Sequence, residues 1–298
     1  MFQGKDEIKN LIRLFRWREV SLFHACQFIE FHSYLTVGGI PSHDCLERQR
    51  LKYNPLVTDD NDRRNGVWDK VFVNLQDYGE IFSRGKDGTP NAYGPILFKI
   101  NPEAFSVATE VAITLRSAGA SNFNRQEEAL SSITEVDRVF CYSTSPLVRF
   151  TNNLREAFPD RPANYVESVE IHCVFPDGYL PLNYVEAVIV DPYWIKEKQL
   201  LFFVNNVRST CRARFPISTR TVRDERRSLY KELACLFIHS ILSNGPVPSL
   251  EDLLYASSVS EDMQAWAQRI SCRSMGWQFE RFSTYLCNGT LRPILQLT

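Results

Sequence analysis

A histidine at the end of a short apolar segment is the first side chain of this chain whose placement could do chemistry. His24 lies in the run Leu22-Phe23-His24-Ala25-Cys26, and a helix-like stretch over residues 27–37 follows it and stops at Gly38-Gly39. A strand-end imidazole beside a glycine turn can hydrogen-bond a ligand held over that turn. A buried structural histidine is the alternative, and the residues downstream bear on the choice.

Arginine side chains gather in two stretches of the chain. In the first stretch arginines alternate with aromatic residues, a mixture suited to gripping phosphates and stacking unpaired bases. These residues are Arg149, Phe150, Arg155, Phe158, Arg161 and Tyr165. The second stretch holds Arg208, Arg212, Arg214, Arg220, Arg223, Arg226 and Arg227. It is a candidate phosphate track, and a solvated charged face is the alternative.

The overall composition is that of an ordinary globular protein. The chain has 298 residues, of which 44% are apolar, so it can bury a sizeable core. Lysine and arginine number 34 against 35 acidic residues, which excludes a generally basic surface. The eight cysteines form no Cys-x-x-Cys pair, which argues against a zinc ribbon or a disulfide framework and favours a reducing cytoplasm. No apolar run approaches the ~20 residues of a membrane span, so we expect neither signal peptide nor anchor.

Hydrophobic periodicity and turn residues predict the elements that must position these side chains. Helices are predicted over residues 5–18 and 28–36, the second ending at Gly38. Strands are predicted over residues 20–25, 71–73, 96–100, 138–142, 168–175, 184–190 and 199–205. Residues 44–69 are expected to form a loop, and residues 74–95 an extended connection rich in glycine and proline. Further helices are predicted over residues 228–243, 250–257, 261–270 and 277–287.

The order of these elements predicts an α+β fold. The strands do not alternate regularly with helices, and a glycine-rich phosphate fingerprint is missing, which disfavours a doubly wound sheet. We therefore expect a core of mixed or antiparallel strands, preceded by an N-terminal helix and followed by a helical subdomain. The predicted boundary separates residues 1–221 from residues 222–298.

Three segments of the chain, taken together, resemble a known family. The first is Phe23-His24-Ala25, followed by Leu35 and Gly38. The second is VNLQDYGEIF, residues 73–82, ahead of the predicted strand over residues 96–100. The third is VEIHC, residues 169–173, followed by a proline turn and the predicted strand over residues 184–190. These segments resemble the DarT-type toxins of the ADP-ribosyltransferase fold, which attach ADP-ribose to nucleic-acid bases.

The chain departs from the pattern of that family at three points. Cys26 stands where a threonine is usual, and Glu30 stands where an asparagine contacts the cofactor. Asn74-Leu75-Gln76 precede Asp77 without the usual histidine. These departures indicate a divergent branch.

The resemblance implies that residues 1–221 form a catalytic domain, that NAD is the co-substrate and that Glu170 is the catalytic residue. Transfer of ADP-ribose passes through an oxocarbenium-like state, which needs an anion near the sugar. The Glu170 carboxylate could hold the ribose 2'-hydroxyl, stabilise the developing cation or take a proton from the attacking base. A strand residue that faces solvent is the alternative for Glu170.

The resemblance also implies a cofactor-binding set. His24 would hydrogen-bond the adenosine ribose or carry the contacts that hold nicotinamide, and the main chain of Ala25 would contact the carboxamide. Tyr78 and Phe82 would offer faces for nicotinamide to stack on, with core packing as their alternative. Arg64, or Arg63 beside it, would pair with the pyrophosphate. The full set is His24, Ala25, Gly39, Arg64, Tyr78 and Phe82, and no metal is expected.

These implications lead to one functional hypothesis and two rivals. We expect a cytoplasmic NAD-dependent ADP-ribosyltransferase that modifies a base in single-stranded RNA or DNA, as the toxin of a toxin–antitoxin or anti-phage defence system. The residues expected to contact the nucleic acid are Arg149, Arg155, Arg161, Arg208, Arg212 and Arg214, and an antitoxin protein is an expected partner. One rival is a protein-modifying transferase, although Ser168 leaves no Glu-x-Glu pair before Glu170. The other is a catalytically inactive nucleic-acid-binding protein of the same fold.

Overall fold

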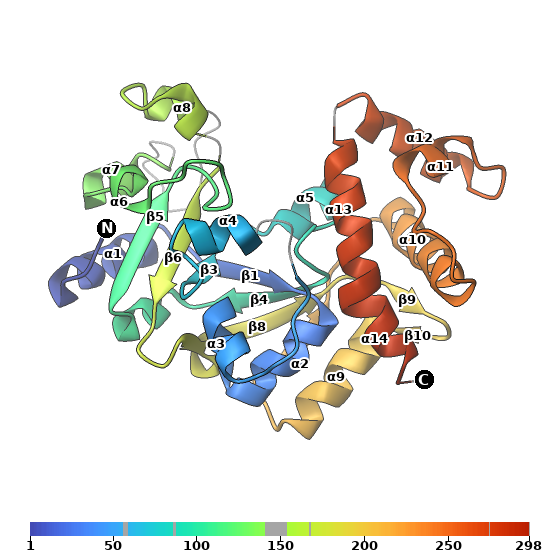
Figure 1. Cartoon of the computed structure of the whole chain (residues 1–298), viewed down its shortest axis with the longest axis horizontal. Coiled ribbons are helices and arrows are strands. Elements are labelled where there is room, and N and C mark those ends of the chain that lie inside the picture. The colour runs from blue at the N-terminus through green and yellow to red at the C-terminus, as the bar shows by residue number, and fades with distance from the viewer. Residues whose placement is uncertain (56–58, 86–87, 141–153, 167, 274, 298) are drawn as a thin grey trace.

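The computed structural model describes the whole chain except residues 56–58, 86–87, 141–153, 167, 274 and 298 (Figure 1). Two sheets form its centre. The four-stranded sheet has the order β1-β4-β8-β11, and the three-stranded sheet has the order β3-β6-β5. The strands of the first are β1 (Leu22–Cys26), β4 (Ile96–Ile100), β8 (Val185–Val190) and β11 (Ile217–Thr219). Those of the second are β3 (Val71–Val73), β5 (Glu110–Thr114) and β6 (Glu170–Val174).

Both sheets are antiparallel except for one pair, because β11 runs parallel to β8. The register places His24 opposite Phe98 on β4, and Phe72 opposite His172 on β6. An isolated bridge between Phe23 and Asn74 joins the two sheets. The expected α+β fold with antiparallel strands and an N-terminal helix is confirmed.

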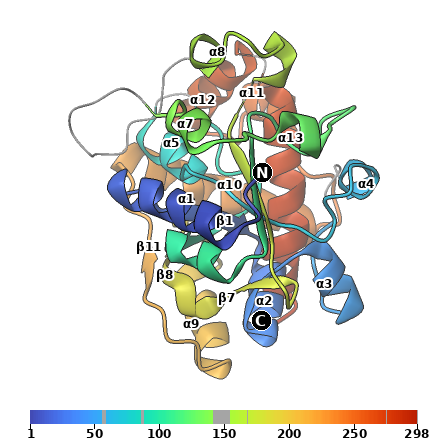
Figure 2. The same ribbon diagram turned by 90° about the vertical axis from the view of Figure 1, so that its left-hand side faces the viewer.

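The N-terminal helix α1 (Lys5–Trp17) follows from its apolar periodicity. Ile8, Leu11, Ile12 and Phe15 are buried, while the charged residues between them face outward. The carboxylate of Glu7 accepts hydrogen bonds from the main-chain nitrogens of Gln3 and Gly4, at 3.1 and 3.2 Å, and so caps the first turn. The helix covers one side of the molecule beside the 3₁₀ turn η1 (Pro102–Val107) (Figures 1 and 2).

The helix that follows β1 is α2 (Phe28–Val37), and it ends as predicted at Gly38. Gly38 has φ of 81°, a left-handed conformation that glycine adopts without strain. Gly39 then pairs with Pro181 in a two-stranded sheet of β2 (Gly39–Pro41) and β7 (Tyr179–Pro181). A Cβ at Gly39 would lie 2.1 Å from the Tyr179 ring, so this position needs glycine for packing.

The remaining elements lie in the connections and the C-terminal part. The shorter ones are α3 (His43–Arg48), α4 (Asp59–Arg64), α5 (Tyr78–Arg84), α6 (Arg125–Glu128), α7 (Ile133–Asp137), α8 (Leu154–Ala157), η2 (Ala163–Tyr165), η3 (Leu182–Tyr184), β9 (Trp194–Ile195) and β10 (Lys198–Gln199). The C-terminal part holds α9 (Leu200–Thr210), α10 (Asp224–Leu242), α11 (Leu250–Tyr255), α12 (Glu261–Ser271), α13 (Gly276–Leu286), the π-helical turn η4 (Cys287–Leu291) and α14 (Arg292–Leu295). Within the described residues, none of these helices is long and apolar enough to span a membrane.

The C-terminal helices pack on the same core as the sheets. One continuous cluster of buried apolar residues runs from Phe2 to Ile294. Trp266 on α12 donates a hydrogen bond to the carbonyl of Gly88 at 3.1 Å, and Thr290 accepts one from the main chain of Phe28 at 3.0 Å. Helices α10, α12 and α13 therefore contact the connection between β3 and β4, and α13 stands beside the central strands (Figure 1).

Several predicted elements are wrong. Residues 199–205 were expected to form a strand, but they begin α9, which buries Leu200, Phe203 and Val204 at helical spacing. A short apolar run fits either a buried strand or a helix, and packing decides between them. Residues 133–137 form α7 and Arg138 caps it, so no strand begins at 138, while residues 141–142 lie outside the described part. The expected loop over residues 44–69 contains α3 and α4, and the expected extended connection over residues 74–95 contains α5.

Phe98 offers a test of this shared core. It is fully buried on β4, with its ring centroid 5.7 Å from Phe31 and 6.0 Å from Phe215. We expect Phe98→Ala to lower the free energy of unfolding by about 3–5 kcal/mol, because it removes buried apolar area and leaves a cavity. Urea unfolding would measure this. Phe202→Ala is the control, because Phe202 is 43% exposed, and a loss at Phe98 no greater than at Phe202 would contradict the assignment.

Candidate active site

The Glu170 carboxylate has one oxygen that is held and one that is open. Oε2 accepts a hydrogen bond from the main-chain nitrogen of Ala118 at 2.8 Å and another from Nε2 of His172 at 2.9 Å. Oε1 has no hydrogen bond from the described residues, and the side chain is 17% exposed. A carboxylate fixed through one oxygen presents the other in a defined direction. This is the arrangement that a general base or a cation-stabilising anion needs.

The loop that carries Ala118 is itself fixed by α4 and the residues that follow it. Asn65 donates from Nδ2 to the carbonyls of Ala118 and Ala120, at 2.6 and 3.2 Å. Asn61 donates to the carbonyl of Gly119 at 2.8 Å. These bonds connect residues more than 50 positions apart, so no local sequence pattern could predict them. They hold the Ala118 N–H toward Glu170.

Two tyrosines interact electrostatically with the Glu170 carboxylate. Burial, and then the Glu170 carboxylate, raise the pKa of Tyr78 above its ordinary value. The same two causes raise the pKa of Tyr93 to about 12. Both hydroxyls therefore stay protonated at neutral pH and can donate hydrogen bonds. Tyr93 nevertheless keeps 41% of its surface exposed, so its burial is only partial. Tyr78 and Glu170 were both expected in the site, whereas sequence reasoning missed Tyr93.

Tyr78 is held in place by a buried ionic network. It begins α5 directly after Asp77, whose Oδ1 accepts from the main-chain nitrogen of Glu80 at 3.2 Å. Arg220 donates to both Asp77 oxygens, at 2.5 and 3.0 Å, and to Asp191 at 2.6 Å. A Cβ at position 79 would lie 2.6 Å from the Arg220 guanidinium, so Gly79 permits the contact. Arg220 therefore fixes the start of α5.

The main-chain N–H and C=O of Ala25 point to the side of β1 on which β3 lies, at a position that is beyond the end of β3. Phe23 exchanges two hydrogen bonds of 2.8 Å with Asn74, so its N–H and C=O point toward β3. Alternation along an antiparallel strand turns the N–H and C=O of Ala25 the same way. No hydrogen bond from the described residues engages them. Ala25 thus presents one donor and one acceptor, as an amide ligand would require.

The His24 side chain is occupied by protein partners. Its Nδ1 lies 2.7 Å from the carbonyl of Phe72 and its Nε2 lies 3.0 Å from the Tyr34 hydroxyl. A carbonyl only accepts, so Nδ1 carries the proton and Nε2 accepts from Tyr34. Burial lowers the pKa of His24 to about 4, which keeps the ring neutral. In this structure His24 acts as a link between β1, β3 and α2.

The remaining cofactor-binding predictions lie apart from Glu170 or inside the core. Phe82 is fully buried, with its ring against Tyr230 at 4.9 Å and Trp266 at 5.6 Å. Phe82 thus packs in the core, which was the alternative to the expected stacking of nicotinamide on its ring. Arg64 is exposed at the end of α4, where it donates to the carbonyl of Asp60 at 3.2 Å and to the Asn61 side chain.

The arginines expected to bind nucleic acid differ in how far they are exposed. Arg212 and Arg214 are exposed, as is Arg155 on α8. Arg208 is half-buried and donates to the carbonyl of Phe215 at 3.2 Å. Arg161 donates to the carbonyl of Glu128 at 2.8 Å. Arg149 lies outside the described residues.

Some residues of the two arginine stretches are buried, so they do not belong to the phosphate-binding and base-stacking surfaces expected from the sequence. Arg220 belongs to the ionic network with Asp77, and Arg226 donates to the carbonyl of Gly85 at 3.1 Å. Phe158 is 2% exposed and packs against the Arg138 guanidinium, 4.6 Å from the ring centroid. It offers no face to an unpaired base. Arg223 and Arg227 are exposed, as are Arg212 and Arg214 earlier in the same stretch.

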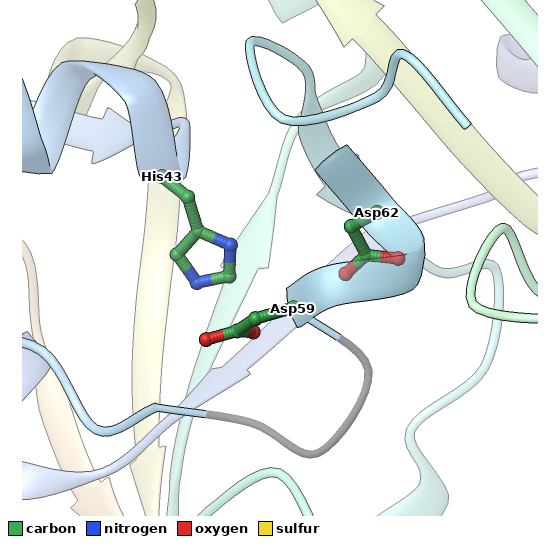
Figure 3. Close-up of side chains that lie close together, drawn as sticks. All are labelled: His43, Asp59 and Asp62. Carbon is green, nitrogen blue, oxygen red and sulfur yellow. The ribbon is translucent and has the colours of Figure 1, made fainter. Parts of the chain in front are cut away.

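A group of possible metal ligands lies at the ends of α3 and α4. His43, Asp59 and Asp62 each place one ligand atom within 4.8 Å of the others (Figure 3). Burial, and then His24, lower the pKa of His43 to about 4, so its ring is neutral. Ligand atoms about 2.0–2.2 Å from one ion lie at most about 4.4 Å apart. The spacing of the three ligand atoms therefore lies within or just above the range that one ion requires.

Comparison with known proteins finds similar solved structures, among them two of the same protein. No protein-family model and no curated protein matches the chain. DarT from Thermus sp. 2.9 in complex with ADP-ribosylated ssDNA is 12% identical, covers 71% of this chain and 96% of its own, and has a TM-score of 0.41. The same protein in complex with NAD⁺ is 10% identical, covers 71% and 97%, and has a TM-score of 0.39. Both come from the family that the three sequence segments resemble.

The lowered pKa of His24 predicts how stability changes with pH. The unfolded state takes up a proton near pH 6.5, whereas the folded state resists it until about pH 4. The stabilisation is therefore present above pH 6.5 and is lost as the pH falls toward 4. We expect a loss of about 2 kcal/mol between pH 7 and pH 5 from this residue, measured by urea unfolding.

His24→Asn should flatten that dependence, because asparagine does not titrate. His32→Gln is the control, since His32 is exposed. An unchanged pH dependence in His24→Asn would show that the imidazole is not held neutral.

Proposed function

We propose that the chain is an NAD-dependent ADP-ribosyltransferase with Glu170 as its catalytic residue. One observation carries the proposal: the partly exposed Glu170 carboxylate is anchored through Oε2, accepts no hydrogen bond at Oε1 from the described residues, and is near enough to Tyr78 and Tyr93 to raise their pKa values. The three sequence segments that resemble DarT-type toxins add support, because they supply these same elements. The contacts of Glu170 in this chain support the proposal without the resemblance.

The distances within the sheet fit a ligand that spans Ala25 and Glu170. Val73 pairs with Ile171, so Glu170 lies across from Asn74, which bonds to Phe23. Strands are spaced about 4.8 Å apart, so Glu170 lies roughly 10 Å from β1. The main chain of Ala25 would hold the carboxamide of nicotinamide, while Glu170 would face the adjoining ribose. Tyr78 and Tyr93 would cover the ring with their faces.

The chemistry asked of Glu170 follows from its geometry. When bound, NAD supplies a ribose whose bond to nicotinamide breaks with development of positive charge on the sugar. The open Oε1 would stabilise that charge or accept a hydrogen bond from the 2'-hydroxyl. It could also take the proton of the attacking group. The bonds from Ala118 and His172 keep the carboxylate from turning away.

We propose that the acceptor is a base in single-stranded RNA or DNA. Arg212, Arg214, Arg223 and Arg227 are exposed and would contact phosphates, together with Arg155 on α8. Such an activity would make the chain the toxin of a toxin–antitoxin or anti-phage defence system, with an antitoxin protein as its partner and the cytoplasm as its place of action. Ser168 leaves no second glutamate before Glu170, which argues against the protein-modifying rival.

Glu170→Gln tests the catalytic assignment. Glutamine keeps the size of the side chain but removes the charge, so we expect transfer to fall at least about 100-fold with folding intact. The measurement is transfer of labelled ADP-ribose from NAD to separate pools of single-stranded DNA, RNA and protein. Glu261→Gln, at an exposed position of α12, is the matched control.

Three outcomes of that measurement are informative. Label on nucleic acid that disappears in Glu170→Gln supports the proposal. Label confined to protein would support the protein-modifying rival. Binding of nucleic acid without any transfer, unchanged in Glu170→Gln, would support the inactive nucleic-acid-binding protein.

Tyr78 provides a second test, because its ring and its hydroxyl can be separated. We expect Tyr78→Phe to keep the KM for NAD within about threefold, since the stacking face remains. Tyr78→Ala should raise that KM about 10-fold or more, because an aromatic contact is worth roughly 1–3 kcal/mol. Steady-state kinetics with varied NAD would measure both. Equal values in the two variants would argue against stacking on this ring.

A further inference from the structure

His172 is a buried histidine, and its one hydrogen bond to a side chain or main chain of the described residues is with Glu170. It lies two residues after Glu170 on β6, so the two side chains share a face of the strand. The ring is fully buried, with centroids 5.0 Å from Phe72 and 5.6 Å from Phe123. Its Nε2 lies 2.9 Å from Oε2 of Glu170, and its Nδ1 has no hydrogen-bond partner among the described residues.

These contacts define the protonation of the ring. The carboxylate oxygen also accepts from the Ala118 N–H, so it acts as an acceptor and Nε2 must carry the proton toward it. Nδ1 then has a lone pair that accepts no hydrogen bond from the described residues, and it lies among aromatic rings. A buried acceptor without a partner destabilises the fold, and a phenylalanine would fill the same space without that cost. The stabilising contact that an imidazole offers here is the Nε2–H bond to Glu170.

We propose that His172 is a positioning residue for Glu170, an inference that rests on the proposed transferase function. Its Nε2–H and the Ala118 N–H approach the same oxygen and hold Oε2 from two directions. The remaining freedom of the carboxylate, rotation about its terminal bond, is thereby removed. Oε1 is left as the single oxygen that faces the substrate. A bond to an ionised acceptor is stronger than a neutral one, which suits this role.

Three substitutions separate this role from core packing. His172→Gln keeps a donor near the place of Nε2, because a glutamine amide reaches as far as that atom. His172→Asn places its amide near Nδ1 and cannot reach Glu170. His172→Phe fills the volume and offers no donor. All three are to be checked for folding by circular dichroism and thermal melting.

The kinetic prediction follows from the position of the donor. We expect kcat for ADP-ribose transfer to fall about 10- to 100-fold in His172→Phe and His172→Asn, the effect of losing one bond to a charged group. KM for NAD should stay within about twofold, and His172→Gln should recover most of kcat. Wild-type kcat in His172→Phe would overturn the inference, as would equal losses in all three folded variants.

Nuclear magnetic resonance separates this inference from the proposed function. In protein labelled with ¹⁵N-histidine, we expect the His172 ring to carry a proton on Nε2, and Glu170→Ala to shift that nitrogen. A proton on Nδ1, or no response to Glu170→Ala, would overturn the inference even if transfer is observed. Absence of transfer by the wild-type protein, with the expected nitrogen signals present, would instead reject the transferase function and with it the positioning role.

Discussion

Two main-chain hydrogen bonds between Phe23 and Asn74, each 2.8 Å long, join the two sheets beside Glu170. Pairing stops there, because β3 ends at Val73 and the chain turns into α5. The main-chain N–H and C=O of Ala25 point to the same side of β1 as those of Phe23, and among the described residues no strand pairs with them on that side. Since β6 pairs with β3, the same termination places Glu170 across from Asn74. The position where one three-residue strand ends therefore sets the spacing of the candidate site.

The C-terminal helices support the segment that carries the two tyrosines. Phe82 packs on Tyr230 and Trp266, while Gly85 and Gly88 accept hydrogen bonds from Arg226 and Trp266. Burial raises the pKa of Asp191 to about 6, and Arg220 joins that carboxyl to Asp77. Residues on both sides of the predicted boundary after Thr221 thus meet around α5. A charge network of this kind fixes geometry, because each partner would be costly to leave buried alone.

Local patterns predicted the elements whose signals lie within one segment. The apolar face of α1, the strand around His24 and the glycine stop at Gly38 are of this kind. Side chains whose environment comes from distant residues were beyond such patterns. Phe82 is covered by residues about 150 to 180 positions later, and Arg220 is neutralised from position 77. Tyr93 lies outside the three segments, and His172 lies within the third without an expected role, so only their interactions with Glu170 mark them.

The hydroxyl of Thr290 accepts a hydrogen bond from Phe28 and donates one to the Gln27 side chain at 2.8 Å. Gly289 lies so close that a Cβ there would be 2.5 Å from that of Gln27. The turn after β1 is thus completed by residues that lie more than 260 positions later in the chain and are synthesised last. Contacts this far apart cannot form while their second half is inside the exit tunnel. The turn after β1 therefore reaches its final form only after residues 289 and 290 have been synthesised and have left the tunnel.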